Sequence, residues 1–157
     1  MNYALEATVD ICFRIGHFRN LTDRYLRSLF LHVSVSAGDL QASPYLIISD
    51  NQNPSSITLF EYVSPLYSFS PNAKAELSEL AVFRLNIPIQ DLETSPLSCK
   101  FTLFQQQFGG VQHVLDEITI NHTTLLWVNS YCPVFFRDSG CGIDLTVQTQ
   151  MLKYRMK

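Results

Sequence analysis

The chain has 157 residues and a mass of 17.9 kDa, which predicts a single domain over residues 1–157. Hydrophobic residues make up 46% and charged residues only 16%, so the composition can fill a core and argues against a disordered tail. The formal charge of −3 and the pI of about 5.7 argue against a general nucleic-acid binder, which usually carries a basic surplus. Four cysteines and six glycines also exclude the disulfide-dense and collagen-like classes.

Neither a targeting segment nor a membrane span is recognisable in the sequence. Acidic and basic residues interrupt the first fourteen residues, where a secretory signal would need a basic start and an apolar run. The most apolar stretch, residues 26–37, is broken by Arg27 and His32, whereas a membrane-spanning helix needs about 20 predominantly apolar residues. These observations predict a soluble, cytoplasmic protein.

Charge is distributed unevenly along the chain. Residues 1–32 carry a net charge of +1, residues 33–99 carry −5, and residues 100–157 return to +1. Seven of the eleven basic residues lie in the segments 14–27 and 153–157, which contain Asp23 as their only acid. If the two ends pack together the surface is bipolar, and otherwise the charges are spread over a solvated surface.

Alternation of hydrophobic and polar residues is the main structural signal. Because successive side chains of a β-strand point to opposite faces, each alternating segment predicts a strand with one buried and one solvated face. Five segments alternate in this way, namely residues 7–15, 29–36, 82–89, 99–103 and 143–148. Their hydrophobic positions predict one shared core, made of Val9, Ile11, Phe13, Leu31, Val33, Phe83, Leu85, Phe101, Leu145 and Val147.

Weaker signals lie between these strands. Further strands are predicted at residues 45–49 and 57–63, on either side of the polar turn 50–54, and at residues 111–120 and 125–128. Asn72 is positioned to cap a helix of about two turns over residues 73–80, and Thr22 to cap a turn through Leu26. The whole pattern predicts an all-β fold, an antiparallel β-sandwich of about six to eight strands with one or two short helices.

The motifs of catalytic and cofactor sites are absent from the sequence. The pair Gly109-Gly110 is followed by Val111 and Gln112 rather than by the Lys and Ser or Thr of a phosphate-binding loop. Residues 138–142 approach a serine-nucleophile turn in composition but not in spacing, so they predict a turn between strands. We therefore predict no catalytic residue and no cofactor.

The cysteines show no metal-ligand spacing, because Cys12, Cys99, Cys132 and Cys141 form no C-x-x-C pair. Cys99 alternates with apolar neighbours and is predicted to be a core residue. Cys12 falls on the polar face of its strand, where a reactive thiol and a bystander both remain open. Free thiols are expected rather than disulfide bridges.

Calcium binding and glycosylation are both expected to be absent. A calcium site needs several carboxylate oxygens from neighbouring loops, and the chain contains no Asp-x-Asp pair. Two glycosylation sequons begin at Asn20 and Asn121, and without a secretory signal both are expected to be unused.

Candidate contact residues lie mainly in a basic and aromatic segment near the start of the chain. Four arginines alternate there with Phe18, Leu21 and Tyr25, a mixture that suits anionic lipid headgroups, an acidic protein partner, or a solvated loop without functional contacts. Trp127 lies in an apolar run that fits either a buried strand or an exposed patch. The predicted partner-binding residues are Arg14, Arg19, Arg24, Arg27 and Trp127.

The run Val9-Asp10-Ile11-Cys12-Phe13-Arg14-Ile15-Gly16-His17-Phe18-Arg19-Asn20-Leu21 resembles the opening of a known N-terminal domain. That domain belongs to the large eukaryotic lipase-like "family with sequence similarity" proteins, and the segments 81–89 and 113–128 are similar to it in order and character. The resemblance implies a C2-like fold whose first strand runs into an F-x-N-hydrophobic loop. The hydrolase half of those proteins has no counterpart here, so no catalytic residue is carried over.

These features favour a non-catalytic C2-like interaction module. Such a module would dock on a protein partner or on an anionic membrane within a trafficking or scaffolding assembly, and no nucleic acid is expected as a partner. One alternative is an enzyme whose site is assembled from dispersed groups such as Cys12, His32 and Asp144. A secreted or viral structural β-sandwich is a third possibility, kept open by the sequons.

Overall fold

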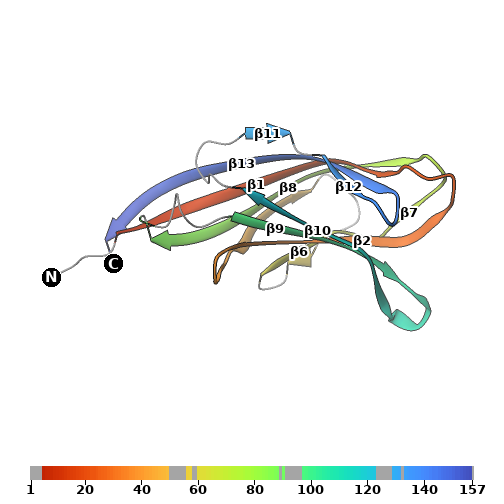
Figure 1. Cartoon of the computed structure of the whole chain (residues 1–157), viewed down its shortest axis with the longest axis horizontal. Helices are drawn as coiled ribbons and strands as arrows, with labels where there is room; N and C mark the ends of the chain where they lie inside the picture. The colour runs from red at the N-terminus through yellow and green to blue at the C-terminus, as the bar shows by residue number, and fades with distance from the viewer. Residues whose placement is uncertain are drawn as a thin grey trace.

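A computed structural model describes residues 5–49, 56–57, 60–88, 90, 97–122, 129–131 and 133–156 of the chain. The predicted strand 125–128 with Trp127, the polar turn 50–54 and Cys132 lie outside the described residues. Within them, the molecule is an elongated sandwich of two antiparallel β-sheets (Figure 1).

The first sheet, sheet A, has the strand order β11-β13-β1-β8-β4, with β12 also paired to β13. Its strands are β1 (Leu5–Asn20), β4 (Ser43–Ser49), β8 (Lys74–Pro88), β11 (Asn129–Tyr131), β12 (Val134–Phe136) and β13 (Cys141–Met156). The long strands β13, β1 and β8 form its centre, so β1 is paired along most of its length on both sides.

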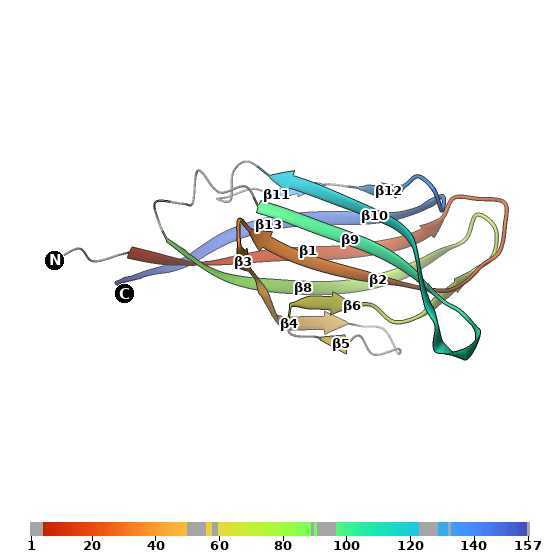
Figure 2. The ribbon, with the colours of Figure 1, turned by 60° about the horizontal axis from the view of Figure 1, so that its bottom comes forward.

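The second sheet, sheet B, has the order β10-β9-β2-β6-β5, with β3 and β7 also paired to β2. Its strands are β2 (Leu26–Ala37), β3 (Leu40–Gln41), β5 (Ser56–Ile57), β6 (Glu61–Val63), β7 (Tyr67–Phe69), β9 (Leu97–Gln106) and β10 (Gln112–His122). Figure 2 shows β10, β9 and β2 crossing in front of sheet A as one layer.

The core lies between the two sheets and contains the residues that alternation predicted. All ten predicted core side chains are at most 3% exposed, which confirms their assignment. Phe13 of β1 links the layers: its ring meets Phe83 of sheet A at a centroid distance of 5.6 Å and Phe101 of sheet B at 6.0 Å, both edge-on. Cys99 is also buried in this core, as predicted.

The outer face of β1 is less solvated than its polar residues predicted. Thr8 and Asp10 are 5% and 4% exposed, because the neighbouring strands cover β1 from both sides. Both side chains are satisfied: the Thr8 hydroxyl donates to Asn86 at 2.8 Å, and Asp10 accepts from Arg84 Nε at 2.9 Å and from the Tyr45 hydroxyl at 2.5 Å. A buried polar group needs such partners.

The predicted helix at residues 73–80 is wrong, because this segment is the first half of β8. Its Ala, Glu, Leu and Lys residues have high helix propensity, but pairing with β1 overrides this preference. The strand is irregular here: the β1–β8 register shifts between Ile15 and His17, and Ser78 has a φ of 47°. This β-bulge removes the strict period of two that would have identified the strand.

The sandwich has seven described strands of seven or more residues, which fits the predicted six to eight. The additional strands have only two or three residues each, too short for a periodic signal. Among the described residues, a 3₁₀ turn spans Phe108–Gly110, and Gln90 also has 3₁₀ conformation. In the part of the chain that the structure covers, no helix has the length and apolar character to cross a membrane.

Candidate functional site

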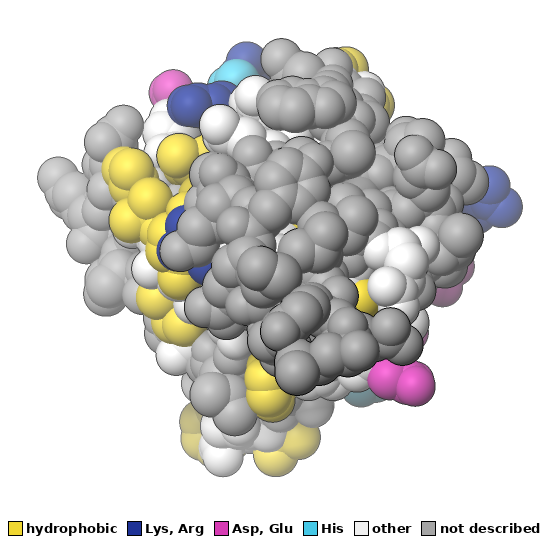
Figure 3. All heavy atoms as spheres, turned by 90° about the vertical axis from the view of Figure 1, so that its left-hand side faces the viewer, with side chains coloured by type: hydrophobic (Ala, Val, Ile, Leu, Met, Phe, Trp, Pro, Cys, Tyr) yellow, Lys and Arg dark blue, Asp and Glu magenta, His cyan; other side chains and the backbone are white. Residues whose placement is uncertain are grey.

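Three connections gather at one end of the sandwich, opposite the chain termini, and the β9–β10 hairpin projects away from the body on the same side (Figures 1 and 2). The three connections are residues 21–25 between β1 and β2, 70–73 between β7 and β8, and 137–140 between β12 and β13, and the hairpin turn is residues 107–111. We call this region the loop end. Figure 3 views the opposite end, where described hydrophobic side chains gather on one side and charged ones lie around the periphery.

Asn20 holds the loop end together from a buried position at the end of β1. Its side-chain amide donates to the carbonyls of Arg24 at 2.7 Å and Ser70 at 3.0 Å, while its Oδ1 accepts from the backbone N–H of Thr22 at 3.0 Å. The Asn20 side chain, which begins the first sequon, is therefore fully hydrogen-bonded within the protein, and only 1% of the residue is exposed. Asn121, of the second sequon, is exposed on β10.

Hydrogen bonds between backbones join the connections further. The N–H of Leu21 donates to the carbonyl of Gly140 at 2.9 Å, and the N–H of Asn72 donates to the carbonyl of Thr22 at 2.9 Å. Gly140 has a φ of +76°, and a Cβ there would lie 2.3 Å from Thr22 Cγ2. The close approach therefore requires glycine. The three connections 21–25, 70–73 and 137–140 are therefore one connected frame rather than independent loops.

Apolar side chains project from this frame and from the hairpin into solvent. Phe108 is 104% exposed, Tyr25 69%, Val111 59% and Leu21 51%. Phe108 stands at the tip of the β9–β10 hairpin, which extends beyond the body of the sandwich in Figure 1. Because single exposed apolar side chains are common on protein surfaces, Phe108 is a candidate contact residue through its place at the projecting tip rather than through its exposure alone.

The hairpin turn is built to present Phe108. The N–H of Gln107 donates to the carbonyl of Val111 at 2.6 Å, closing the turn, and Gly109 has a φ of 83° that favours glycine. The glycine pair, which does not fit a phosphate-binding loop, instead forms the turn after Phe108, and the sequence pattern did not predict this role. The available signal was a single aromatic residue between three glutamines and two glycines.

Arg24 and Arg27 lie at the loop end with exposed side chains. Among the described residues, neither is paired with an acidic side chain, so both cations are available to a ligand. The connections of the loop end contain two cations, Arg24 and Arg137, against two acids, Asp23 and Asp138, and residues of both charges also lie beside them, at Arg27, Lys74, Glu76 and Asp116. The loop end is therefore not basic as a whole, and what distinguishes Arg24 and Arg27 is that both are exposed without an acidic partner among the described residues.

Arg19 is engaged within the protein. Its Nη2 lies 2.6 Å from Asp144 Oδ2 across β1 and β13, and Tyr131 donates its hydroxyl to Asp144 Oδ1 at 3.2 Å. His17 Nδ1 is 3.3 Å from the same Asp144 Oδ2. The hydrogen bond from Arg19 is the main cause that lowers the pKa of Asp144 below its usual value.

The remaining predicted contact residues do not join the loop end. Arg14 is exposed on the outer face of sheet A, opposite Leu80 and Thr146 in the strand register. Trp127 lies outside the described residues. The basic C-terminal segment also lies elsewhere, because Lys153 pairs with Thr8 near the start of β1. The structure therefore brings together Arg24 and Arg27 and separates them from Arg14.

A small apolar groove of about 170 Å³ adjoins the loop end on sheet A. Leu21, Val134 and Phe135 line it, Gly142 lies between them, and the Arg19–Asp144 pair forms its polar edge. Phe135 is 52% exposed. The groove has room for one apolar side chain of a partner.

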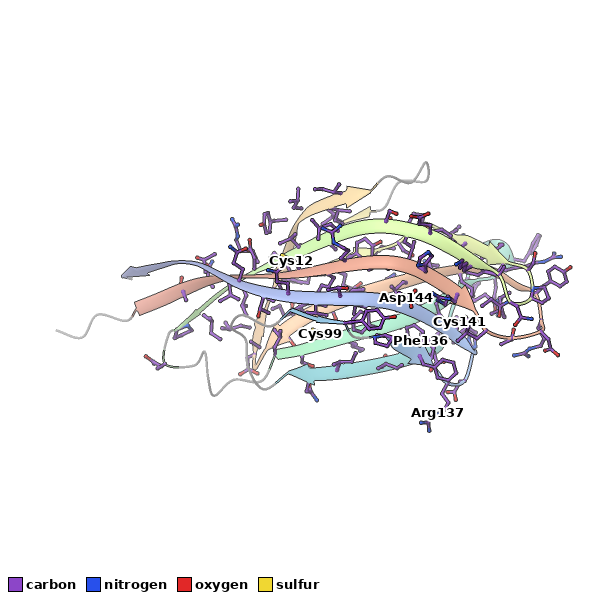
Figure 4. All side chains as sticks on the ribbon, turned by 90° about the horizontal axis from the view of Figure 1, so that it is seen from above. Cys12, Cys99, Phe136, Arg137, Cys141 and Asp144 are labelled. Carbon is purple, nitrogen blue, oxygen red and sulfur yellow. The ribbon has the colours of Figure 1, made fainter. Side chains whose placement is uncertain are left out.

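The residues of the alternative catalytic site lie far apart. Cys12 and Asp144 are on sheet A, separated along the sandwich in Figure 4, and Cys12 pairs with Gln148, which is about 13 Å from Asp144 along β13. His32 is on sheet B. Burial, followed by the charge of Asp10, raises the pKa of the Cys12 thiol, which disfavours a reactive thiolate.

The other labelled groups of Figure 4 do not form a site either. Arg137 points away from the sandwich, whereas Cys141 and Phe136 are fully buried. Burial is the main cause that raises the pKa of the Cys141 thiol. Among the residues that the structure describes, no three His, Cys, Asp or Glu side chains are placed to hold a metal ion.

Comparison with known proteins identifies the fold. No family model matches the chain, and no curated protein matches it in sequence. Its structure is similar to a C2 domain of plant extended synaptotagmin 1, the domain designated A, with a TM-score of 0.55 over 92% of this chain and 95% of that one, at 8% identity. The chain therefore has a C2-like β-sandwich fold, as the sequence resemblance implied. The similarity to the lipase-like proteins in particular remains a prediction.

Proposed function

We propose that the chain is a non-catalytic docking module that contacts an anionic membrane through its loop end. The single observation behind this proposal is the combination of the fully exposed Phe108 with Arg24 and Arg27, which are exposed and have no acidic partner among the described residues. The C2-like fold supports a docking module in general. Membership of a trafficking or scaffolding assembly belongs to the same proposal.

Energetics support weak, reversible docking by one copy of the loop end. A basic residue near an anionic leaflet contributes about 1 kcal/mol. Full burial of a large apolar side chain contributes about 1.5–3 kcal/mol. Arg24, Arg27, Phe108 and a partly buried Tyr25 together give about 5 kcal/mol, which corresponds to a dissociation constant of about 0.1–1 mM. Stable attachment would therefore need a second contact.

A protein partner is a second candidate, and the groove beside Leu21 is the observation that favours it. The groove offers Val134 and Phe135 to an apolar side chain and the Arg19–Asp144 pair to a polar neighbour. Trp127, outside the described residues, remains a proposed contact for such a partner. The separation of Cys12, His32 and Asp144 gives no support to the enzyme alternative.

Single substitutions distinguish the two candidates. Phe108→Ser and Phe135→Ser each replace one exposed phenylalanine, so neither should change the melting temperature appreciably. If the membrane proposal holds, Phe108→Ser reduces flotation with phosphatidylserine vesicles about tenfold while Phe135→Ser floats like the parent chain. Equal flotation of all three proteins would contradict the proposal. Loss of captured cytosolic protein in Phe135→Ser alone would favour the protein partner.

A further inference from the structure

The outer face of sheet B contains a hollow that the docking proposal does not use. Its volume is about 390 Å³, within the range of small-molecule sites. It opens on the face of β10, β9, β2 and β6 that is turned forward in Figure 2, away from the tip of the β9–β10 hairpin. The hollow is therefore a separate surface from the loop end.

Strand register explains which side chains surround the hollow. Thr119 of β10 pairs with Lys100 of β9, Lys100 pairs with Ser34 of β2, and Ser34 pairs with Glu61 of β6. A second row lies beside the first. In it, Ser98 of β9 pairs with Ser36 of β2, and Ser36 pairs with Gln41 of β3. Neighbouring strands are about 4.8 Å apart, so the two rows form a polar patch about 14 Å wide.

Small side chains create the depression and leave their hydroxyls free. Serines at the centre of both rows leave a hollow between the larger Lys100, Gln41 and Phe60. Within the described part of the chain, the side chains of Ser34, Ser36 and Ser98 have no intramolecular hydrogen bond. Each hydroxyl can donate one hydrogen bond and accept two, so the patch offers several donors and acceptors to a ligand.

The charges around the hollow argue against a phosphorylated ligand. Lys100 is the one cation among the lining residues, and its Nζ lies 3.4 Å from Glu117 Oε2. Glu117 is not a lining residue, whereas Glu61 lines the hollow and lies 2.8 Å from His32 Nδ1. The lining thus contains one carboxylate and one cation that is already paired with Glu117, so the site has no net positive charge for an anionic headgroup or phosphate.

We propose that this hollow binds a neutral, hydroxyl-rich ligand, namely a sugar unit of an uncharged oligosaccharide. The free serine hydroxyls, Gln41 and Thr119 supply hydrogen bonds to the hydroxyl groups of the sugar. Phe60, at the edge and 40% exposed, supplies an apolar surface for the C–H face of the ring. Because the hollow is open, water satisfies these hydroxyls in the free protein, so each hydrogen bond to a sugar replaces one to water and the expected affinity is low.

An array of uncharged glucan, mannan, galactan and chitin oligosaccharides tests the assignment, with titration calorimetry of each bound glycan. We expect binding by at least one neutral oligosaccharide at about 1 mM. Ser36→Leu fills the hollow and Phe60→Ala removes the apolar edge, and each is expected to weaken that binding about tenfold or more. The matched control is Ser43→Leu, which places the same change on an exposed position of β4 in sheet A.

The outcomes separate clearly. Binding that is weakened in Phe60→Ala and retained in Ser43→Leu supports the proposal, even if Ser36→Leu fails to fold by circular dichroism. Three results would overturn it: no neutral glycan bound, binding that both hollow variants retain, or binding only of inositol hexakisphosphate or another anionic probe. The membrane proposal is unaffected by any of these results, because it rests on different residues.

Discussion

The side-chain amide of Gln105 donates a 3.1 Å hydrogen bond to the backbone carbonyl of Arg27, which lies 78 residues earlier in the sequence. Gln105 belongs to the base of the β9–β10 hairpin, and Arg27 to the start of β2. The bond therefore ties the hairpin that presents Phe108 to the segment that presents Arg24 and Arg27. An apolar tip and two cations are thus positioned by one frame.

Phe13 and Phe108 are a pair of phenylalanines with opposite environments, fully buried and fully exposed. We expect Phe13→Ala to lower the free energy of unfolding by about 3–5 kcal/mol, because it leaves a cavity between both sheets. We expect Phe108→Ala to change it by less than about 0.5 kcal/mol. Chemical denaturation of both variants measures the difference, and similar values for the two would show that the core is misassigned.

Asn20 should stabilise the loop end through its side-chain hydrogen bonds, although its sequon would otherwise suggest a glycosylated surface residue. Asn20→Asp replaces the amide that donates to the carbonyls of Arg24 and Ser70 by a carboxylate that repels them. We expect a loss of about 1–3 kcal/mol in the free energy of unfolding. Asn121→Asp, at the exposed second sequon, is the control. Equal stability of the two variants in thermal melts would refute the role given to Asn20.

Asp116 should anchor the turn between β12 and β13. Its Oδ2 accepts from the backbone N–H groups of Asp138 and Ser139, both at 3.0 Å, and from the Ser139 hydroxyl at 3.2 Å. Asp116→Ala leaves these donors unpaired, so we expect it to lose about 1.5–3 kcal/mol. Asp138→Ala, which keeps the backbone bond of that residue, should lose much less. Urea unfolding curves measure the stability loss of each variant, and equal losses would contradict the role given to Asp116.

The Arg19–Asp144 pair should give stability a defined pH dependence. The pKa of Asp144 is lowered in the folded chain, so its contribution is present above the unfolded pKa of about 4 and is lost as pH falls through the lower folded value. We expect Asp144→Asn to melt about 1–3 °C lower at pH 7. The difference should shrink as the pH falls below the unfolded pKa and should disappear once the pH is below the lowered folded pKa of Asp144. A difference that stays constant across this range would mean that the carboxylate charge is not involved.

The strands that pass through the core were predictable from sequence, because burial of one face requires a period of two. Val9 and Leu145, for example, lie on different strands and both follow this rule. The start of β8 was not predictable, because the bulge at Ser78 interrupts the period and the composition favours a helix. The outer face of β1 was misjudged as solvated because a single sequence does not indicate which neighbours cover it.

The contact surface was only partly predictable. The sequence predicts neighbouring arginines as one contact segment, and of these Arg24 and Arg27 do lie together at the loop end. Arg19 is paired with Asp144, which is 125 residues away and has no local sequence signal. Phe108 was missed because a lone aromatic residue in a turn has no periodicity, and only the structure shows that the base of its hairpin is bonded to Arg27.

The central claim, that the loop end is the docking surface, is tested most directly by vesicle flotation of two charge-reversal variants. One carries Arg24→Glu with Arg27→Glu, and the control carries Arg14→Glu on the outer face of sheet A. Flotation uses phosphatidylserine vesicles with a calcium chelator, at low and at physiological salt, because exposed charges are screened beyond about 8 Å at physiological ionic strength. The account predicts calcium-independent flotation that weakens with salt, is retained by the Arg14 variant and is lost by the double variant. Flotation of the double variant at the level of the parent chain would contradict it.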